Sequence, residues 1–172
     1  MDDQIEIVLA GAERLDEIAP VWASLHEYHI SIEHERNSEI RAARQTWEAR
    51  RADFEYALST PGAFMALAQE SDRRVVGFAV VHLRANHNWR VHGERFAELE
   101  TLAVLPGYRG KGIGRRLMAA AYDQIRAEGV EELSIVVVEQ NADARRFYEA
   151  EGFLPWHVTY FGPIPGAKIG ED

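Results

Sequence analysis

The spacing of apolar residues changes along the first third of the chain, from a strand-like period of two to a helix-like period of three or four. At residues 4–9 every second side chain is apolar, as in a strand with one buried face. From residue 13 to residue 29 apolar residues recur every three or four positions, which predicts an amphipathic helix. Pro20 should kink or divide this helix, because proline removes a hydrogen bond from a helix interior. The same spacing predicts a second helix over residues 40–58, ending before the Pro61-Gly62 pair.

Strand patterns return in the middle of the chain. Residues 63–69 and 75–84 are rich in apolar and β-branched residues and flank the polar triplet 71–73, which predicts a hairpin. Residues 85–94 are polar and irregular and predict a loop. Arg95–Val104 then reads as the central strand, half polar at its start and apolar at its end.

Helices and strands alternate in the C-terminal part. An apolar stripe predicts a helix over residues 113–128, and Gly129 suits the left-handed residue that ends a helix. The β-branched run 133–138 predicts a strand that is buried on both faces. A helix follows through residue 150 with Asn141 as its N-cap, and residues 153–161 are predicted to form the last strand.

Composition narrows the class of protein. The chain has 172 residues, 47% of them hydrophobic, no cysteine and a formal net charge of −9. These values predict one globular domain over residues 1–162 with a loose tail over 163–172, and they exclude disulfides and thiolate metal sites. We see no secretory signal or long apolar run, and the acidic balance disfavours nucleic-acid binding. We therefore expect a cytoplasmic protein without membrane or nucleic-acid partners.

The most informative stretch joins the central strand to the helix that follows it. The spacing Arg109-x-x-Gly112-x-Gly114 fits a loop whose backbone N–H groups wrap a diphosphate, because glycine permits close approach and positive φ. The helix that follows would add the positive end of its dipole. Four basic residues gather here in an otherwise acidic chain: Arg109, Lys111, Arg115 and Arg116.

Two common phosphate-binding loops do not match this stretch. A Walker A loop requires serine or threonine after its lysine, whereas Gly112 follows Lys111. A dinucleotide-binding fingerprint that begins at Gly110 would require glycine at position 115, where Arg115 stands. The loop therefore belongs to another class.

Two motifs resemble those of the GNAT superfamily of N-acetyltransferases. Residues 102–118, LAVLPGYRGKGIGRRLM, are similar to its acetyl-CoA loop, Gln/Arg-x-x-Gly-x-Gly/Ala. Residues 141–153, NADARRFYEAEGF, resemble its motif N-x-x-A-x-x-F-Y-x-x-x-G-F. The resemblance covers roughly residues 96–153, while residues 1–95 match in the order of elements.

The resemblance implies an α/β (α+β) fold with a mixed, mostly antiparallel central sheet, splayed between strands 4 and 5 and flanked by helices. It also implies that acetyl-CoA (coenzyme A) is the cofactor, with its diphosphate held by the loop, helped by Arg115 or Arg116, and its pantetheine arm held by the strand end and Asn141. The implied cofactor-binding residues are Leu102, Ala103, Val104, Arg109, Gly110, Lys111, Gly112, Ile113, Gly114, Arg115, Asn141 and Tyr148.

Acetyl transfer to an amine needs a polarised carbonyl, a base for the ammonium and an acid for the leaving thiolate. By resemblance, the Val104 N–H is the oxyanion donor and Tyr148 is the acid. A phenol stays protonated at neutral pH, since its ordinary pKa is about 10. The alternative for Tyr148 is a purely structural role beside Phe147.

Glu98 and Glu100 are the candidates for the base. They share one face of the central strand because side chains alternate with a period of two. Either carboxylate could instead cap a solvated strand face or pair with an arginine such as Arg84 or Arg95. The resemblance makes Glu98 the first choice, because histone-acetylating members of the family place their catalytic glutamate there, and Glu100 the second. Which of the two acts as base stays open at this point.

The acceptor pocket is the least specified part of the prediction. His26, Tyr28, His29 and Trp89 come from segments that line this pocket in similar proteins, so they are candidates for substrate contact. The histidines lack the spacing of a metal-binding motif, and we expect no metal. The predicted function is transfer of acetyl from acetyl-CoA to a primary amine by direct attack in a ternary complex. A small-molecule acceptor is favoured. A protein N-terminus or lysine, a non-catalytic acyl-CoA-binding role and a homodimer stay open.

Overall fold

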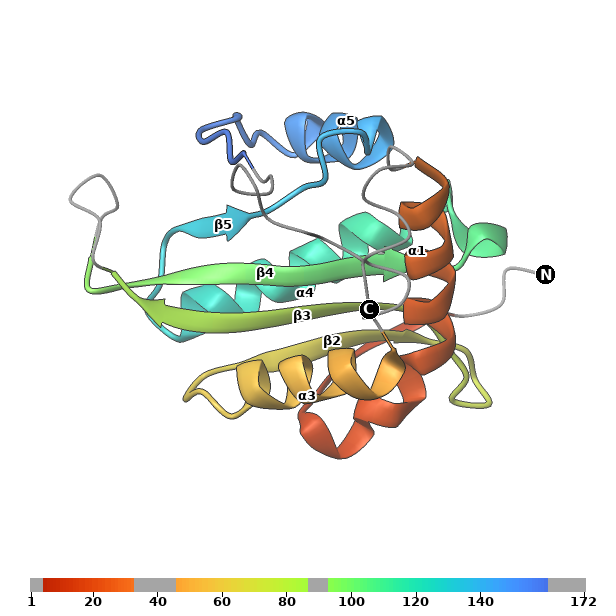
Figure 1. Ribbon diagram of the computed structural model, residues 1–172. Coiled ribbons are helices and arrows are strands. Elements are labelled where there is room, and N and C mark those ends of the chain that lie inside the picture. Colours follow the sequence, from red (N-terminus) through yellow and green to blue (C-terminus); the bar gives the residue numbers. More distant parts are fainter. Residues whose placement is uncertain (1–4, 33–45, 87–92, 161–172) are drawn as a thin grey trace, which may run out of the picture.

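The computed structural model describes residues 5–32, 46–86 and 93–160, and these residues form one five-stranded mixed sheet (Figure 1). The strands lie in chain order, antiparallel from the first to the fourth, and the fifth is parallel to the fourth. They are β1 (Glu6–Ala10), β2 (Phe64–Gln69), β3 (Val75–Ala85), β4 (Arg95–Val104) and β5 (Leu133–Ile135). The predicted fold class is confirmed.

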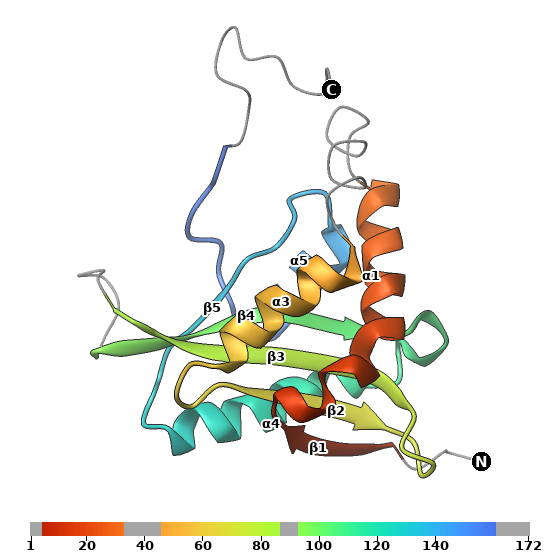
Figure 2. The same cartoon turned by 60° about the horizontal axis from the view of Figure 1, so that its bottom comes forward.

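Helices cover both faces of this sheet (Figures 1 and 2). One face carries the 3-10 helix η1 and helices α1 and α3, and its core centres on Phe54 and Phe78. The other face carries α4, with α5 beside it, around Leu117 and Met118. The helices are η1 (Ala12–Ile18), α1 (Ala19–Ile32), α3 (Trp47–Leu58), η2 (Pro106–Tyr108), α4 (Ile113–Ala127) and α5 (Ala142–Ala150).

Local signals in the sequence explain where several of these elements begin and end. Pro20 lies in the first turn of α1, directly after η1, so the predicted division of the first helix is confirmed. The hairpin between β2 and β3 closes as predicted, with Arg73 at φ 71° in its turn. Gly129 follows α4 at φ 70°, and Asn141 caps α5 by accepting a hydrogen bond from the Ala144 N–H at 3.0 Å. Within the described residues, no helix is both long enough and apolar enough to cross a membrane.

The strand prediction at the C-terminal end is wrong for the residues that the structure describes. Residues 153–160 form no strand, although their apolar side chains alternate. A strand needs a partner for its backbone groups, and no described residue pairs with this segment; Pro155 in addition lacks an N–H. The alternating side chains are instead exposed: Leu154, Trp156, Val158 and Tyr160. The predicted tail, residues 163–172, lies outside the described residues.

A β-bulge in β4 sets which side chains face the helices α1 and α3. Val81 pairs with Leu99 and Val80 pairs with Thr101, so Glu100 is an extra residue without a partner on β3. Before the bulge, Leu99 packs into the core under α4, whereas after it Leu102 does so. Glu98, Glu100 and Thr101 therefore lie on the same side of the sheet, which a regular strand would not allow.

The sheet opens between β4 and β5. Only three residues of β4, Ala97–Leu99, pair with β5. The predicted strand 133–138 is correspondingly shorter, because Val136–Val138 leave β4 at this point, and Val136 is 83% exposed. Within the described part of the chain, no strand pairs with residues Glu100 to Val104 of β4 on this side. This opening confirms the predicted splay between the fourth and fifth strands.

Candidate functional site

The loop between β4 and α4 ends at the N-terminus of α4 and contains two glycines in the left-handed region. Gly110 and Gly112 have φ values of 74° and 76°, and a Cβ atom at either position would meet no other atom within 4 Å. Glycine is required here by backbone conformation, not by space. The first intrahelical hydrogen bond runs from Arg116 N–H to Gly112 C=O at 3.1 Å. The N–H groups of residues 113–115 thus precede the helical ladder and point out of its N-terminus.

The four cations of this loop are not equivalent. Arg115 Nε donates to Glu151 Oε1 at 2.9 Å, and Arg116 Nη2 donates to the Ile5 carbonyl at 2.6 Å, so these two guanidinium groups are held by the protein itself. Lys111 Nζ lies 5.2 Å from the centre of the Tyr108 ring. Arg109 Nε in turn donates to the Val104 carbonyl at 3.0 Å, so each of the four cations has a contact within the protein.

The end of β4 directs one backbone N–H into the opening of the sheet. Leu105 N–H donates to the Val76 carbonyl on β3 at 2.9 Å. Because backbone groups of successive strand residues point to opposite sides, those of Val104 point away from β3. In agreement, the Val104 carbonyl accepts from Arg109 Nε at 3.0 Å. The Val104 N–H accordingly faces the gap between β4 and β5.

A cavity of about 320 Å³ lies at this gap. Its walls come from α1, α3, the second half of β4, the segment after β5 and the start of α5. Six of the lining residues carry ionisable groups: His26, His29, Arg50, Asp53, Glu100 and Tyr148. Leu102 and Asn141 also line it, so the cavity adjoins the end of β4 and the cap of α5.

Arg50 is the central charged group on the α3 side of the cavity. Its Nη2 atom lies 2.8 Å from Glu100 Oε1 and 2.9 Å from Thr101 Oγ1, and its Nη1 atom lies 3.7 Å from Asp53 Oδ2. The side chains of Arg50 and Glu100 are 26% and 23% exposed, so this ion pair is partly shielded from water. With two carboxylates and one guanidinium, this wall carries a net negative charge.

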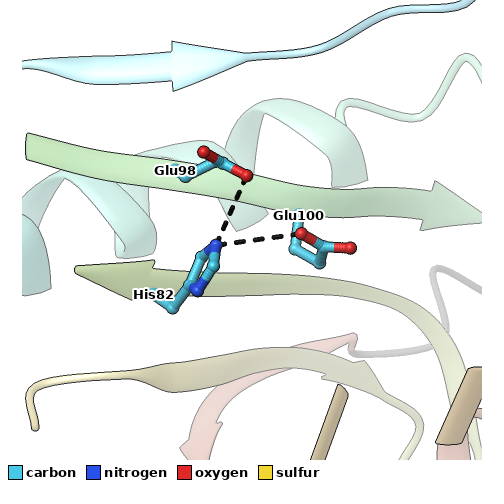
Figure 3. A group of neighbouring side chains, drawn as sticks. All are labelled: His82, Glu98 and Glu100. Carbon is cyan, nitrogen blue, oxygen red and sulfur yellow. Dashed lines mark ion pairs between the residues drawn. The ribbon is translucent and has the colours of Figure 1, made fainter. Parts of the chain in front are cut away.

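Glu98 precedes Glu100 on the same face of β4 and forms an ion pair with a different arginine. Arg84 Nη1 donates to Glu98 Oε2 at 2.9 Å, which realises the ion pair that the sequence left as an alternative. His82 Nε2 lies between the two glutamates, 3.5 Å from Glu98 Oε1 and 3.8 Å from Glu100 Oε2 (Figure 3). Of the two carboxylates, Glu100 lines the cavity and Glu98 does not.

Tyr148 on α5 also lines the cavity. Burial, with a smaller contribution from the neighbouring Tyr122, raises the pKa of the Tyr148 phenol well above its usual range. Its ring packs edge-on against Phe147 and Phe153, at centroid distances of 5.2 and 6.3 Å. The aromatic contacts that the sequence offered as an alternative role therefore coexist with a position on the cavity wall.

A family comparison identifies the architecture. The model of the acetyltransferase (GNAT) family matches residues 22–153, which is most of the chain and includes both motifs. The chain belongs to the GNAT family. The matched residues include the loop 109–114 and the opening of the sheet.

Curated relatives of this GNAT chain are acetyltransferases. It is 31% identical over 114 residues to aminoalkylphosphonate N-acetyltransferase of Salmonella typhimurium, covering 66% of this chain and 71% of that protein. It is 45% identical over 68 residues to mycothiol acetyltransferase of Beutenbergia cavernae, covering 40% of this chain and 23% of that protein. With the mycothiol acetyltransferase of Rhodococcus opacus it shares 26% identity over 90% of its length, and it spans about half (53%) of that protein.

Solved structures share the fold of this chain at low sequence identity. A variant of the BH1408 protein from Bacillus halodurans superposes with a TM-score of 0.72 at 21% identity, over 92% of this chain and 99% of that chain. The aminoglycoside N-acetyltransferase AAC(6')-Iy, solved in complex with CoA, superposes with a TM-score of 0.68 at 18% identity, over 96% and 97%. These similarities show the GNAT fold of the chain.

The structure separates the acceptor-pocket candidates of this GNAT chain. His26 and His29 line the cavity, and His26 stacks on Trp22 at a centroid distance of 5.0 Å. Tyr28 is not among the lining residues and lies under Arg109, whose Cζ atom is 5.4 Å from its ring centre. Trp89 lies outside the described residues.

Two residues at the site escaped prediction from the sequence. Arg50 lies on the same stripe of its helix as Trp47 and Phe54. A charged residue on an apolar stripe is the sequence feature that could have indicated its position at the site. His82 alternates with the core residue Val80 on β3 and pairs across the sheet with Glu98, which only the hairpin register reveals. Together with Glu98 and Glu100 its donor atoms lie within 4.8 Å of one another, but both carboxylates already pair with arginines.

Proposed function

We propose that the protein transfers an acetyl group from acetyl-CoA to the primary amine of a small molecule, by direct attack in a ternary complex. The observation that carries the proposal is the continuity of three features. The positive-φ glycine loop, the N–H of Val104 in the open sheet and the acid-lined cavity follow one another along β4 and the start of α4. In the proposal the loop binds the diphosphate of acetyl-CoA, the Val104 N–H contacts the thioester, and the cavity holds the amine.

In the proposed complex the loop N–H groups of residues 110–115 bind the diphosphate. The pantetheine arm lies along Leu102–Val104, where β4 lacks a neighbouring strand, and Asn141 assists from the cap of α5. Arg109 and Lys111 remain at the outer edge as electrostatic support. Arg115 and Arg116 are assigned a structural role because of their contacts with Glu151 and Ile5.

The chemistry assigns one residue to each proton. The ammonium first loses one proton to Glu100, the carboxylate on the cavity wall, either directly or through water. The neutral amine nitrogen then attacks the thioester carbonyl carbon while the Val104 N–H stabilises the developing oxyanion. The C–S bond breaks, the Tyr148 phenol donates its proton to the CoA thiolate, and the second proton lost by the nitrogen after the attack restores the phenol through water. Burial keeps this phenol protonated over the working pH range, so the proton is available.

The acceptor should be small and cationic. The cavity, of about 320 Å³, must hold the end of the pantetheine arm as well as the acceptor, and pockets for drug-sized ligands begin near this volume. The carboxylates of Glu100 and Asp53 favour an ammonium group over a neutral or anionic acceptor. Relatives named for aminoalkylphosphonate and streptothricin acetylation agree with a small acceptor.

Calorimetry and a substrate screen test the proposal in two steps. Acetyl-CoA, ATP and NAD are titrated separately into the protein, and we expect heat of binding with acetyl-CoA. Amino acids, polyamines, aminoalkylphosphonates, aminoglycosides and a peptide with a free N-terminus are then screened by CoA release. Binding of ATP alone would refute the proposal. Acetyl-CoA binding without transfer to any amine would favour a non-catalytic binding protein, and transfer to the peptide alone a protein acetyltransferase.

A further inference from the structure

His82 on β3 is a polar side chain that faces the two glutamates of the site across the sheet. Its Nε2 atom is buried and makes no hydrogen bond with any described residue, although the side chain as a whole is 13% exposed. The same nitrogen faces Glu98 at 3.5 Å and Glu100 at 3.8 Å (Figure 3). A buried nitrogen without a partner costs stability, so its retention calls for a role.

The charges around His82 balance when its imidazole is neutral. Glu100 faces Arg50 on α3, and Glu98 faces Arg84 on β3, which gives two carboxylates and two guanidinium groups. Beyond this group, the other titratable residues on the cavity wall are Asp53 on α3, His26 and His29 on α1, and Tyr148 on α5. A neutral imidazole directs a nitrogen lone pair or an N–H at the carboxylates and can either accept or donate one proton.

We infer that His82 is a positioning residue that acts through Glu100, by relaying the proton of the acceptor amine from Glu100 to Glu98. The inference rests on the proposed function. The ammonium first protonates Glu100. Its proton then moves to the unprotonated Nε2 of His82, and from the same nitrogen to the Glu98 carboxylate. No tautomer change is needed, because one nitrogen faces both carboxylates.

The geometry gives this relay a direction. Glu100 opens into the cavity, whereas Glu98 lies outside the cavity lining beside Arg84, and their side chains are 18% and 53% exposed. The exposed part of Glu98 gives the proton a route to solvent that does not cross the bound substrates. The separations of 3.5 and 3.8 Å require a shift of a few tenths of an ångström or one bridging water to become hydrogen bonds. Glu100 is thereby returned to its charged form before the next turnover.

An NMR experiment tests the contact without using activity. The ¹⁵N signal of His82 Nε2, assigned by its loss in His82→Gln, is recorded at neutral pH in the wild type, Glu98→Gln and Glu100→Gln. We expect the signal to move in both variants, since each removes one charged neighbour of the nitrogen. Glu149→Gln, which changes an exposed carboxylate on α5, is the control and should leave the signal in place. A signal unchanged in both site variants would overturn the inference.

Kinetics test the relay itself. His82→Gln and Glu98→Gln should each lower kcat/KM for the amine by about tenfold, with the KM for acetyl-CoA unchanged. The double variant should lose no more kcat/KM than the less active of the two single variants, because both changes break the same path. The deficits should shrink as pH rises, since a growing fraction of the amine then binds already deprotonated. His157→Gln, at an exposed histidine, should behave as the wild type.

The outcomes separate the relay from the proposed function. If the wild type acetylates no amine, both fall. If the wild type does acetylate an amine, but the kcat/KM losses of His82→Gln and Glu98→Gln add in the double variant or stay constant with pH, only the relay is refuted. Activity that a chelator abolishes and zinc restores would replace the relay with a metal site at the same three residues. Thermal unfolding and acetyl-CoA affinity report whether His82→Gln folds, and if it does not, the size and pH dependence of the Glu98→Gln deficit decide.

Discussion

Arg50 ties helix α3 to the β4 bulge by contacting Glu100 and Thr101 with a single guanidinium nitrogen, at 2.8 and 2.9 Å. The bulge brings both acceptors to the same face of the sheet, and the guanidinium lies over the Phe54 ring at 4.3 Å. The orientation of the proposed base is thus fixed from a helix that precedes it by some fifty residues. The site depends on this helix for its geometry as well as for its walls.

Replacing Arg50 should cost more stability than replacing its neighbour on the same helix. Arg50→Gln removes the guanidinium that contacts both the Glu100 carboxylate and the Thr101 hydroxyl, and the shorter glutamine can replace at most one of these contacts. We therefore expect the free energy of unfolding to fall by about 1–3 kcal/mol. Arg51→Gln breaks ion pairs with Asp16 and Glu55 at the surface and should have a clearly smaller effect. Urea denaturation of both variants measures the difference. Equal losses would mean that the Arg50 contacts add no more than an exposed ion pair.

The loop glycines differ in a way that substitution can isolate. Gly112 and Gly107 both have open space where a Cβ would lie, but only Gly112 has a positive φ. The left-handed conformation is less favourable for alanine by roughly 1–2 kcal/mol. Without ligand, the loop of Gly112→Ala should therefore relax to another conformation, and returning to the left-handed one should weaken the binding of acetyl-CoA by this free energy. We expect acetyl-CoA affinity to fall about tenfold in Gly112→Ala and to stay unchanged in Gly107→Ala. Calorimetry with acetyl-CoA would contradict this if the two variants bound alike.

Burial of Tyr148 predicts a loss of stability at alkaline pH. Its pKa is raised in the folded state, so the folded protein holds the phenolic proton where the unfolded chain releases it. Stability from this group is complete below the unfolded pKa of about 10 and falls as pH rises above that value. In Tyr148→Phe this part of the alkaline loss should vanish. Thermal unfolding between neutral pH and the onset of alkaline denaturation measures it, with Tyr160→Phe, a 91% exposed phenol, as the control.

Much of the fold could be predicted because its signals are local. The bounds of β4 follow from its hydrophobic pattern and from Pro106, and the cap of α5 follows from Asn141. The strand expected after α5 failed for a non-local reason. An alternating pattern supplies side chains for one face of a strand but no partner for its backbone, and residues 153–160 have none in the described structure.

The site was predicted only where its residues lie in contiguous motifs. The period of two correctly placed Glu98 and Glu100 on one face, but it would put Thr101 on the other. The bulge reverses this alternation, and it depends on pairing with β3 that the sequence of β4 alone does not specify. His82 and Arg50 reach the site by the same kind of long-range pairing and packing. Their roles could be seen only once the register and the helix position were known.

Tyr148 and Tyr122 offer a matched pair of buried phenols for testing the assignment of the acid. Tyr148 lines the cavity, whereas the Tyr122 hydroxyl is buried on α4 without a hydrogen-bond partner among the described residues. Removing the acid should slow protonation of the leaving thiolate, so Tyr148→Phe should lower kcat by about a hundredfold while acetyl-CoA affinity changes little. Tyr122→Phe should keep the kcat of the wild type and should not lose stability, because its hydroxyl has no bond to lose. Steady-state kinetics with the best amine from the screen and calorimetry with acetyl-CoA measure both quantities. Equal losses of kcat and of acetyl-CoA affinity in Tyr148→Phe would assign this phenol to cofactor packing, and would leave the thiolate to take its proton from water or from the protonated nitrogen of the tetrahedral intermediate.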